Sequence, residues 1–196
     1  MARRLTPEAR RAEIIEVAHA VISDEGYRAL SLRELARRCG MSAPGLMHYF
    51  PDMRSLLDAV LEHRDEQDLA AMGVMTDTND QPLDQKIEEA LRYYEIHSDE
   101  SRRFDVLEVE ALDPSHPAHE FFQHRDDRNM ALIRPHFERE FVDPDAAIQM
   151  FRLVLDGLWL RSVRNPHQDR VEAWREVQHL VFAGLERRKS AESSVS

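Results

Sequence analysis

Three histidines near the middle of the chain are the first residues whose types and spacing suggest chemistry. His116, His119 and His124 fall within nine residues, beside Asp113 and Glu120. Imidazole and carboxylate groups are ligands that zinc prefers in proteins. However, the spacing from His116 to His119 lacks the i, i+4 face of a helical metalloprotease, and prolines interrupt the segment. We therefore expect a capped turn between helices here, and neither a metal nor another cofactor.

Nucleophilic catalysis finds no support elsewhere in the chain. There is no Ser-His-Asp or Cys-His arrangement in a recognisable context, and the single cysteine, Cys39, falls in an expected turn. A lone cysteine forms no internal disulfide and points to a reducing, cytoplasmic setting. We expect a protein that is not an enzyme. A helical hydrolase or metal-dependent enzyme that uses the histidine cluster is the alternative.

Composition places the chain among ordinary globular proteins. Of its 196 residues, 42% are hydrophobic and 32% are charged, and no apolar run approaches the ~18 residues of a membrane span. The basic N-terminus leads into an amphipathic segment without the apolar core of a secretory signal. This length accommodates one sizeable domain, or a small domain joined to a medium one.

The distribution of charge says more about partners than its sum does. A net charge of −11 argues against nucleic acid, because phosphate neutralisation requires Lys and Arg. Residues 1–54, however, carry nine Arg against seven Asp and Glu, a balance of +2. This asymmetry is typical of a mostly acidic protein that contains one basic-faced module.

Capping signals and apolar periodicity predict an all-α fold. Thr6-Pro7-Glu8 is typical of a helix start, Gly26 of a helix end, and the Ser31 to Glu34 spacing of a capping box. No segment alternates with period two for long enough to predict a strand. We expect a linker over residues 76–82 and a disordered tail over 189–196. Beyond the linker, helices are expected near 83–98, 101–112, 117–140, 144–164 and 168–188.

The first fifty residues have the spacing of a helix-turn-helix. Ala36 is small where two helices must cross closely, Gly40 suits the turn, and Leu46 is placed to fill the shared core. The apolar underside is completed by Leu32, Leu35, Met41 and Phe50. Small residues at the start of the next helix permit close approach to a groove, and the free N–H groups there suit phosphate.

This region closely resembles the DNA-binding region of the TetR family of bacterial transcriptional regulators. The resemblance covers about the first sixty residues, beginning with the helix end Glu25-Gly26-Tyr27. The other matching positions are Ser31, Leu35-Ala36, Gly40-Met41-Ser42, Leu46, Tyr49-Phe50 and Leu56-Leu57. It implies a helix-turn-helix domain over 1–52 and a helical effector-binding and dimerisation domain over 53–188.

The resemblance implies which residues meet double-stranded operator DNA. The expected contacts are Ser31, Ser42, Ala43, Gly45, Met47, His48, Tyr49 and Arg54. Met47 stands where the family often has Tyr, and Met53 where it often has Lys. Both differences remove a phosphate partner that Arg54 and the N-terminal arginines could replace. A ligand-binding helical protein whose DNA module is vestigial is therefore a second alternative.

The remaining helices are expected to bind a second copy and an effector. The last two helices carry apolar faces that could form a monomer's own core, but the resemblance implies a four-helix bundle in a homodimer. The expected interface is Phe151, Leu155, Leu158, Trp159, Trp174, Val177, Val181 and Leu185. The expected effector pocket is Tyr93, Tyr94, His97, Phe104, Leu107, Phe121, Phe122 and Met130. The implied function is a repressor released by a small molecule; an activator could use the same fold.

Overall fold

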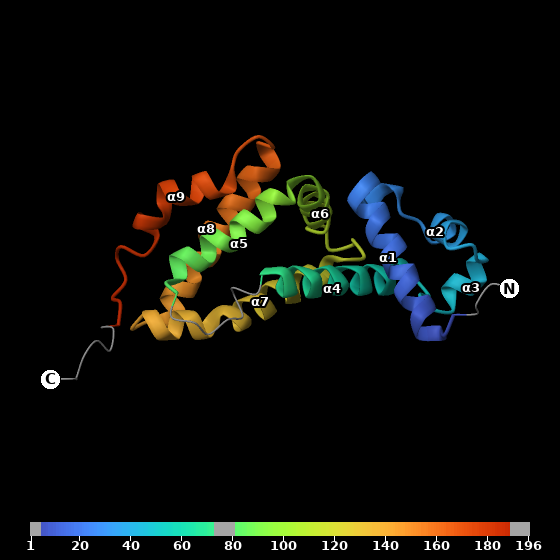
Figure 1. Cartoon of the computed structure of the whole chain (residues 1–196), viewed down its shortest axis with the longest axis horizontal. Coiled ribbons are helices and arrows are strands. Elements are labelled where there is room, and N and C mark those ends of the chain that lie inside the picture. Colours follow the sequence, from blue (N-terminus) through green and yellow to red (C-terminus); the bar gives the residue numbers. More distant parts are fainter. Residues whose placement is uncertain (1–4, 73–80, 189–196) are drawn as a thin grey trace. The chain divides into compact units, whose positions relative to one another are not determined.

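The computed structural model describes residues 5–72 and 81–188, and these residues form an all-α fold (Figure 1). The elements are α1 (Pro7–Glu25), a 3-10 turn η1 (Tyr27–Ala29), α2 (Leu32–Arg38), α3 (Ala43–Met47), α4 (Met53–Met72), α5 (Leu83–Ile96), α6 (Ser98–Glu110), α7 (His119–Glu140), α8 (Pro144–Arg164) and α9 (Arg170–Val181). The all-α prediction is confirmed. Most of the expected linker and the whole expected tail lie outside the described residues.

The helix starts in the first half of the chain follow from their capping residues. Thr6 accepts a hydrogen bond from the Ala9 N–H at 3.2 Å, and Ser31 accepts one from the Glu34 N–H at 3.2 Å. Each side chain satisfies one of the N–H groups that the first turn of a helix leaves without a partner. Gly26 ends α1 with φ of 85°, a backbone conformation that glycine adopts without strain.

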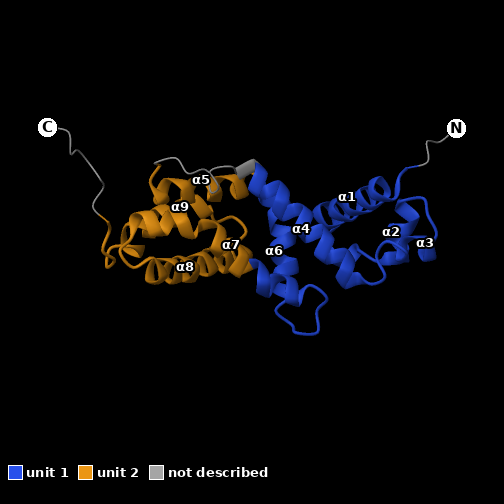
Figure 2. Ribbon diagram, turned by 90° about the horizontal axis from the view of Figure 1, so that it is seen from below, with its two compact units in different colours: residues 1–71, 97–125 blue, residues 72–96, 126–196 orange. Residues whose placement is uncertain are grey.

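The chain packs into two units, each with its own core (Figure 2). The first unit comprises residues 1–71 and 97–125, and its core joins side chains of α1, α2, α3, α4, α6 and the start of α7. The second comprises residues 72–96 and 126–196, and its core lies among α5, α7, α8 and α9. The predicted functional boundary at residue 52 stays a prediction.

The C-terminal part of the second unit differs from the prediction. The last helix was expected to continue to residue 188, but α9 ends at Val181. The residues that follow pair with the chain after α7 instead: the Val142 N–H donates to the Glu186 carbonyl at 2.9 Å, and the Arg188 N–H to the Glu140 carbonyl at 2.7 Å. These inter-segment bonds replace the helical bonds that residues 182–188 would otherwise make.

The positive φ of Gly40, in the turn between α2 and α3, can be tested by substitution. Its φ is 62°, and a Cβ added there would meet nothing within 4 Å, so only backbone strain opposes a larger residue. We expect Gly40→Ala to lower the free energy of unfolding by about 1–2 kcal/mol. Thermal unfolding would show a Tm lower by about 2–4 °C for each kcal/mol.

Gly184→Ala is the matched control, because Gly184 is equally uncrowded and lies outside the left-handed region. Equal stability of the two variants would contradict the positive φ at Gly40.

Candidate nucleic-acid interface

The α2–turn–α3 segment is held as one rigid piece by its own buried residues. Ala36 is 2% exposed and Leu46 is fully buried, so the two helices meet through a small side chain and a core side chain. The Met41 N–H donates to the Ala36 carbonyl at 2.9 Å, closing the turn in which Gly40 adopts positive φ. Phe50, 1% exposed, ends the segment in the same core as Leu46.

The start of α3 exposes Ser42 and Pro44, while Ala43 packs against the core and Gly45 is partly buried. Ser42 caps the helix by accepting a hydrogen bond from the Gly45 N–H at 3.2 Å, and Pro44 occupies the first turn. A Cβ at Gly45 would lie 3.1 Å from the Ser42 hydroxyl, so a larger residue there would crowd the cap. Ser42 and Pro44 are exposed. A flat, uncharged helix start of this kind allows close approach to a groove wall.

The other predicted contact residues divide between exposed and packed positions. Met47 and His48 are exposed at the end of α3, and Ser31 is exposed at the start of α2. Tyr49 is half-buried: it packs against the core and its ring meets that of His48 edge-on, with centroids 5.6 Å apart. Of the predicted contact residues in and around α3, Ser42, Met47 and His48 are thus exposed, and Ala43, Gly45 and Tyr49 are partly buried.

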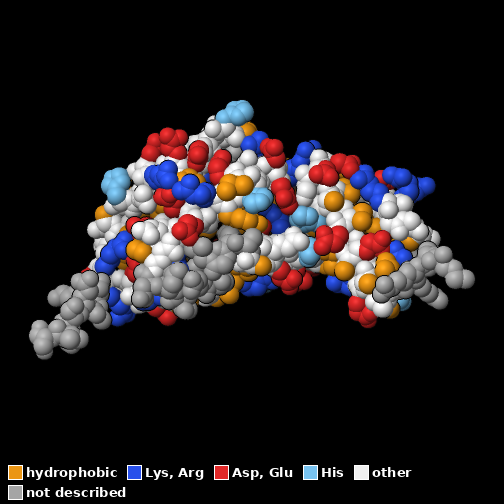
Figure 3. Space-filling model, in the orientation of Figure 1, with side chains coloured by type: hydrophobic (Ala, Val, Ile, Leu, Met, Phe, Trp, Pro, Cys, Tyr) orange, Lys and Arg blue, Asp and Glu red, His pale blue; other side chains and the backbone are white. Residues whose placement is uncertain are grey.

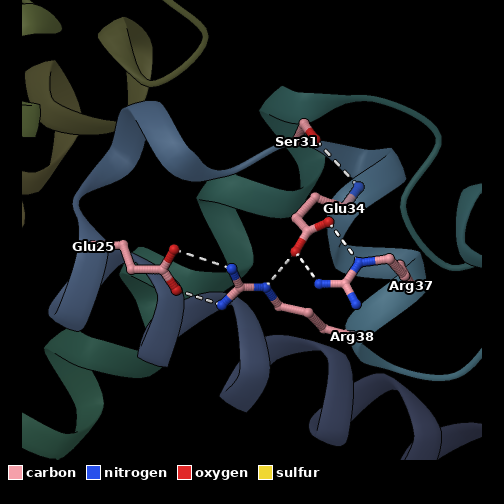
Figure 4. Close-up of polar contacts among 5 residues, drawn as sticks. All are labelled: Glu25, Ser31, Glu34, Arg37 and Arg38. Carbon is pink, nitrogen blue, oxygen red and sulfur yellow. Dashed lines mark hydrogen bonds and ion pairs between the residues drawn. The ribbon is translucent and has the colours of Figure 1, made fainter.

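Two of the three arginines of α2 are held in internal ion pairs (Figure 4). The Glu34 carboxylate accepts hydrogen bonds from Arg37 at 2.6 and 2.8 Å and from the Nε of Arg38 at 2.8 Å. These bonds, first those from Arg37 and then that from Arg38, lower the pKa of Glu34 to about 2. Arg38 also pairs with Glu25 at the end of α1, which fastens α2 to α1.

The remaining arginines of the region can now be sorted by their partners. Arg10 pairs with Glu13 at 2.5 Å, and Arg54 pairs with Glu120 at 2.5 Å. By contrast, Arg33 is exposed and has no acidic partner among the described residues. Arg11 is exposed as well, and its guanidinium lies over the Phe50 ring, 5.0 Å from the centroid.

The sequence alone does not show which of these arginines are paired with a carboxylate. Each partner lies either on a neighbouring turn of the same helix or on a segment that only the fold brings close. On the face shown in Figure 3, basic side chains gather at the end of the first unit that carries α2. Arg33 and Arg11 are exposed, and neither forms an ion pair among the described residues. Arg54, predicted as a DNA contact, has an intramolecular partner instead, and its DNA contact stays a prediction.

The eight residues predicted for an effector pocket divide between the two units. Phe104, Leu107 and Phe121 are buried in the core of the first unit, and Phe122 packs against that core. His97 also belongs to the first unit and is exposed. Tyr93, Tyr94 and Met130 belong to the second unit, where the two tyrosine rings meet edge-on. That these residues line one pocket stays a prediction.

The eight residues predicted for a dimer interface all lie in the second unit. Its core contains Phe151, Leu158, Trp174 and Val181, with Leu155, Val177 and Leu185 packed against it. Trp159 is partly exposed. The opposite side of α8 carries other apolar residues, Met150, Leu153 and Leu160, and these are exposed.

The histidine cluster forms local hydrogen bonds. His116 accepts one from the Ala118 N–H at 3.1 Å, while the Nδ1 atom of His119 lies 2.8 Å from the Ala111 carbonyl. Asp113 accepts from both the N–H and the hydroxyl of Ser115 at 2.8 Å, as the expected capped turn requires. Within residues 5–72 and 81–188, no three His, Cys, Asp or Glu side chains are grouped so as to hold a metal.

The fold and this surface define a helix-turn-helix DNA-binding protein with a larger helical region after its DNA-binding helices. Residues 14–60 match the family model of bacterial regulatory proteins, TetR family. The HTH-type transcriptional regulator BetI of Cronobacter sakazakii is 27% identical over 163 residues, 78% of this chain and 79% of BetI. The HTH-type transcriptional repressor KstR2 of Mycobacterium tuberculosis is 23% identical over 170 residues, 79% of this chain and 80% of KstR2.

A solved structure extends the similarity of fold to nearly the whole chain. The multidrug binding protein EbrR, complexed with imidazole, superposes with a TM-score of 0.68 at 20% identity, covering 92% of this chain and 97% of EbrR. The chain belongs to the TetR family of bacterial transcriptional regulators, a non-enzymatic family, and is a DNA-binding regulator. Among the described residues, no helix is long and apolar enough to cross a membrane.

Proposed function

We propose that this protein is a cytoplasmic repressor that binds a palindromic operator as a homodimer and is released by a small-molecule effector. The observation that carries the proposal is the surface formed by α3 and the residues beside it. Leu46 and the following Phe50 are buried, whereas Ser42, Met47 and His48 are exposed. KstR2 is named a repressor, and EbrR was solved with a bound small molecule.

The proposed DNA contacts keep the predicted residues and add two arginines. Ser42, Ala43, Gly45, Met47 and His48 would approach the groove, with Ser31 and Tyr49 at phosphate or sugar. Arg33 and Arg11 would supply positive charge, because neither pairs with a carboxylate in the part of the chain that the structure describes. Arg54 would reach DNA only by leaving Glu120.

The proposed dimer uses the outer face of α8. At 100° per residue, Met150, Leu153, Gly157 and Leu160 fall on one side of this helix, opposite its core residues. Gly157 is exposed, and a Cβ added there would meet nothing within 4 Å, so a second helix could approach closely at that point. The predicted residues Leu155, Trp159, Val177 and Leu185 are partly buried, and three of them, Leu155, Val177 and Leu185, pack against the core of their own unit.

The experiment that tests the function is a mobility shift on the DNA upstream of the protein's own gene. We expect one retarded complex on a short palindromic segment, with unrelated DNA of the same length bound far more weakly. Addition of small molecules, beginning with imidazole as a probe, would then identify compounds that release the DNA. Binding without sequence preference would contradict an operator-specific regulator, and operator binding that no compound alters would leave only the effector part unsupported.

Arg33→Ala is expected to weaken binding to every DNA sequence and to reduce the slope of log K against log salt by about 1. The reason is that one unneutralised guanidinium at phosphate is lost. Arg175→Ala in α9 is the matched control, because it removes the same charge from the second unit and leaves Glu34 paired with Arg37 and Arg38. Fluorescence anisotropy over a salt series measures both, and equal slopes for the two variants would remove Arg33 from the interface.

A further inference from the structure

Two histidines lie where α1 and α4 meet α6, and all three helices belong to the first unit. His19 of α1 faces α6, and its ring lies 5.3 Å from that of Phe104. His63 of α4 meets His19 edge-on, with ring centroids 6.1 Å apart. The His19 side chain is 15% exposed and that of His63 is 26% exposed. We call this cluster the α1–α4–α6 joint.

Charged groups surround His19 from each of the three helices. The Nε2 atom of His19 lies 3.3 Å from the Glu100 carboxylate of α6, which also accepts a hydrogen bond from Ser23 at 3.3 Å. From α4 come His63 and Arg64, and from α1 comes Glu16, whose carboxylate lies 3.0 Å from the Nε2 atom of His63.

The contact between His19 and Glu100 is close enough for an ion pair but lacks the geometry of a hydrogen bond. The buried Nε2 atom is accordingly left without a hydrogen-bond partner. Arg64 also lies over the Phe104 ring, 4.1 Å from its centroid, and pairs with Asp68 at 3.6 Å. A proton on His19 would therefore place a cation beside another cation that is already buried in the joint.

The balance of these effects favours neutral His19. Burial is the largest influence and lowers the pKa of His19; Glu100 raises it, Arg64 and His63 lower it, and Glu16 raises it less. Because the folded pKa lies below the ordinary value of 6.5, His19 contributes stability that is present above that pH. This contribution is lost as the pH falls through the folded pKa.

The joint shares a core with the DNA-reading helices. Phe104 and Leu107 of α6 belong to the same buried cluster as Leu35, Leu46 and Phe50 of the helix-turn-helix. A proton that disturbs the packing of α1 on α6 would therefore disturb the support of α3. We propose that His19 makes this joint proton-sensitive, so that operator affinity falls as the pH drops below neutral. The proposal rests on operator binding as the function.

The test combines an NMR titration of the histidines in the full chain with operator affinity at pH 7.5 and 5.8 and constant ionic strength. The His19→Gln variant assigns the His19 resonance and removes its charge change. We expect His19 to titrate below the ordinary range, and the acid-induced loss of operator affinity to be several-fold greater for the wild type than for His19→Gln. His179→Gln, an exposed histidine of α9, is expected to behave as the wild type does.

The comparison must be made between variants, because acid also protonates exposed histidines and strengthens non-specific attraction to DNA. If His19→Gln binds the operator weakly at both pH values, a Glu100→Gln variant provides a second test. It removes a group that raises the pKa of His19, so His19 should titrate at still lower pH and affinity should persist further into acid.

Two results would overturn the proposal. One is titration of His19 at or above its ordinary range, and the other is an identical pH dependence of operator affinity for the wild type and both variants. Failure of every variant to bind an operator at either pH would instead contradict the proposed function. The NMR titration would still decide whether the joint holds a neutral histidine.

Discussion

Replacing Leu153 with arginine is expected to convert the proposed dimer to a monomer and to lower operator affinity by about 10² to 10⁴-fold. Leu153 is 59% exposed on α8, between Met150 and Leu160, and contributes nothing to the core of its own unit. In a two-fold interface each substitution appears twice, so two guanidinium groups would be desolvated at one contact. Light scattering after gel filtration measures the mass, and a mobility shift measures the affinity.

The size of the effect on DNA follows from the small footprint of one α3 helix. Two half-sites held by one dimer bind with the advantage of a high effective concentration, and a monomer loses this advantage without losing any contact of its own. Leu112→Arg is the control, because Leu112 is 67% exposed in the turn after α6, outside the second unit. A Leu153→Arg protein of unchanged mass would contradict the proposed face.

The sequence was sufficient to predict those features of the fold that depend on interactions between residues only a few positions apart. Thr6 and Ser31 act within three residues of their own positions, so their capping roles are local and were predicted correctly. The positive φ of Gly40 likewise reflects its own lack of a side chain. These local signals predict the helix-turn-helix, and they predict the ends of the C-terminal helices to within about three residues except for the end of α9.

What the sequence could not provide depends on distant partners. Arg33 and Arg37 look alike in the chain, and only the folded α2 shows Glu34 held between Arg37 and Arg38. The helix α8 is apolar on two sides, so its sequence does not say which side meets α9. The same holds for the joint, where His19, His63 and Glu100 come from three helices that only the fold brings together.

The internal ion pairs also bear on how a protein with net charge −11 could approach DNA. Glu34 and Glu25 lie close to the proposed interface, and each would repel phosphate if it were unpaired. Arg37 and Arg38 neutralise them, while Arg33 and Arg11 keep charges that no carboxylate of the described residues pairs with. Short-range complementarity of this kind acts within about one Debye length, roughly 10 Å at 0.1 M salt. The acidic remainder of the chain opposes approach only at longer range, where salt screens it.

Replacing His48 with alanine is expected to lower affinity for the operator by about 5- to 150-fold, the range of one base contact, while binding to unrelated DNA changes little. His48 is the exposed residue that ends α3, and its ring rests edge-on against Tyr49, 5.6 Å between centroids. That packing restricts the imidazole before DNA arrives, so little conformational entropy is lost on binding. Anisotropy with operator and with unrelated DNA of equal length separates the two effects.

His179→Ala removes an exposed histidine of α9 and serves as the matched control for charge and composition. If His48→Ala weakened both DNAs equally, His48 would act at phosphate and not at a base, and the salt slope would fall with it. If it weakened neither, His48 would not contact DNA, and the contacts of α3 would have to come from its other exposed residues, Ser42, Pro44 and Met47. Met47→Ala would then show the larger loss, and this outcome would decide whether Met47, where the family often has tyrosine, is itself a contact.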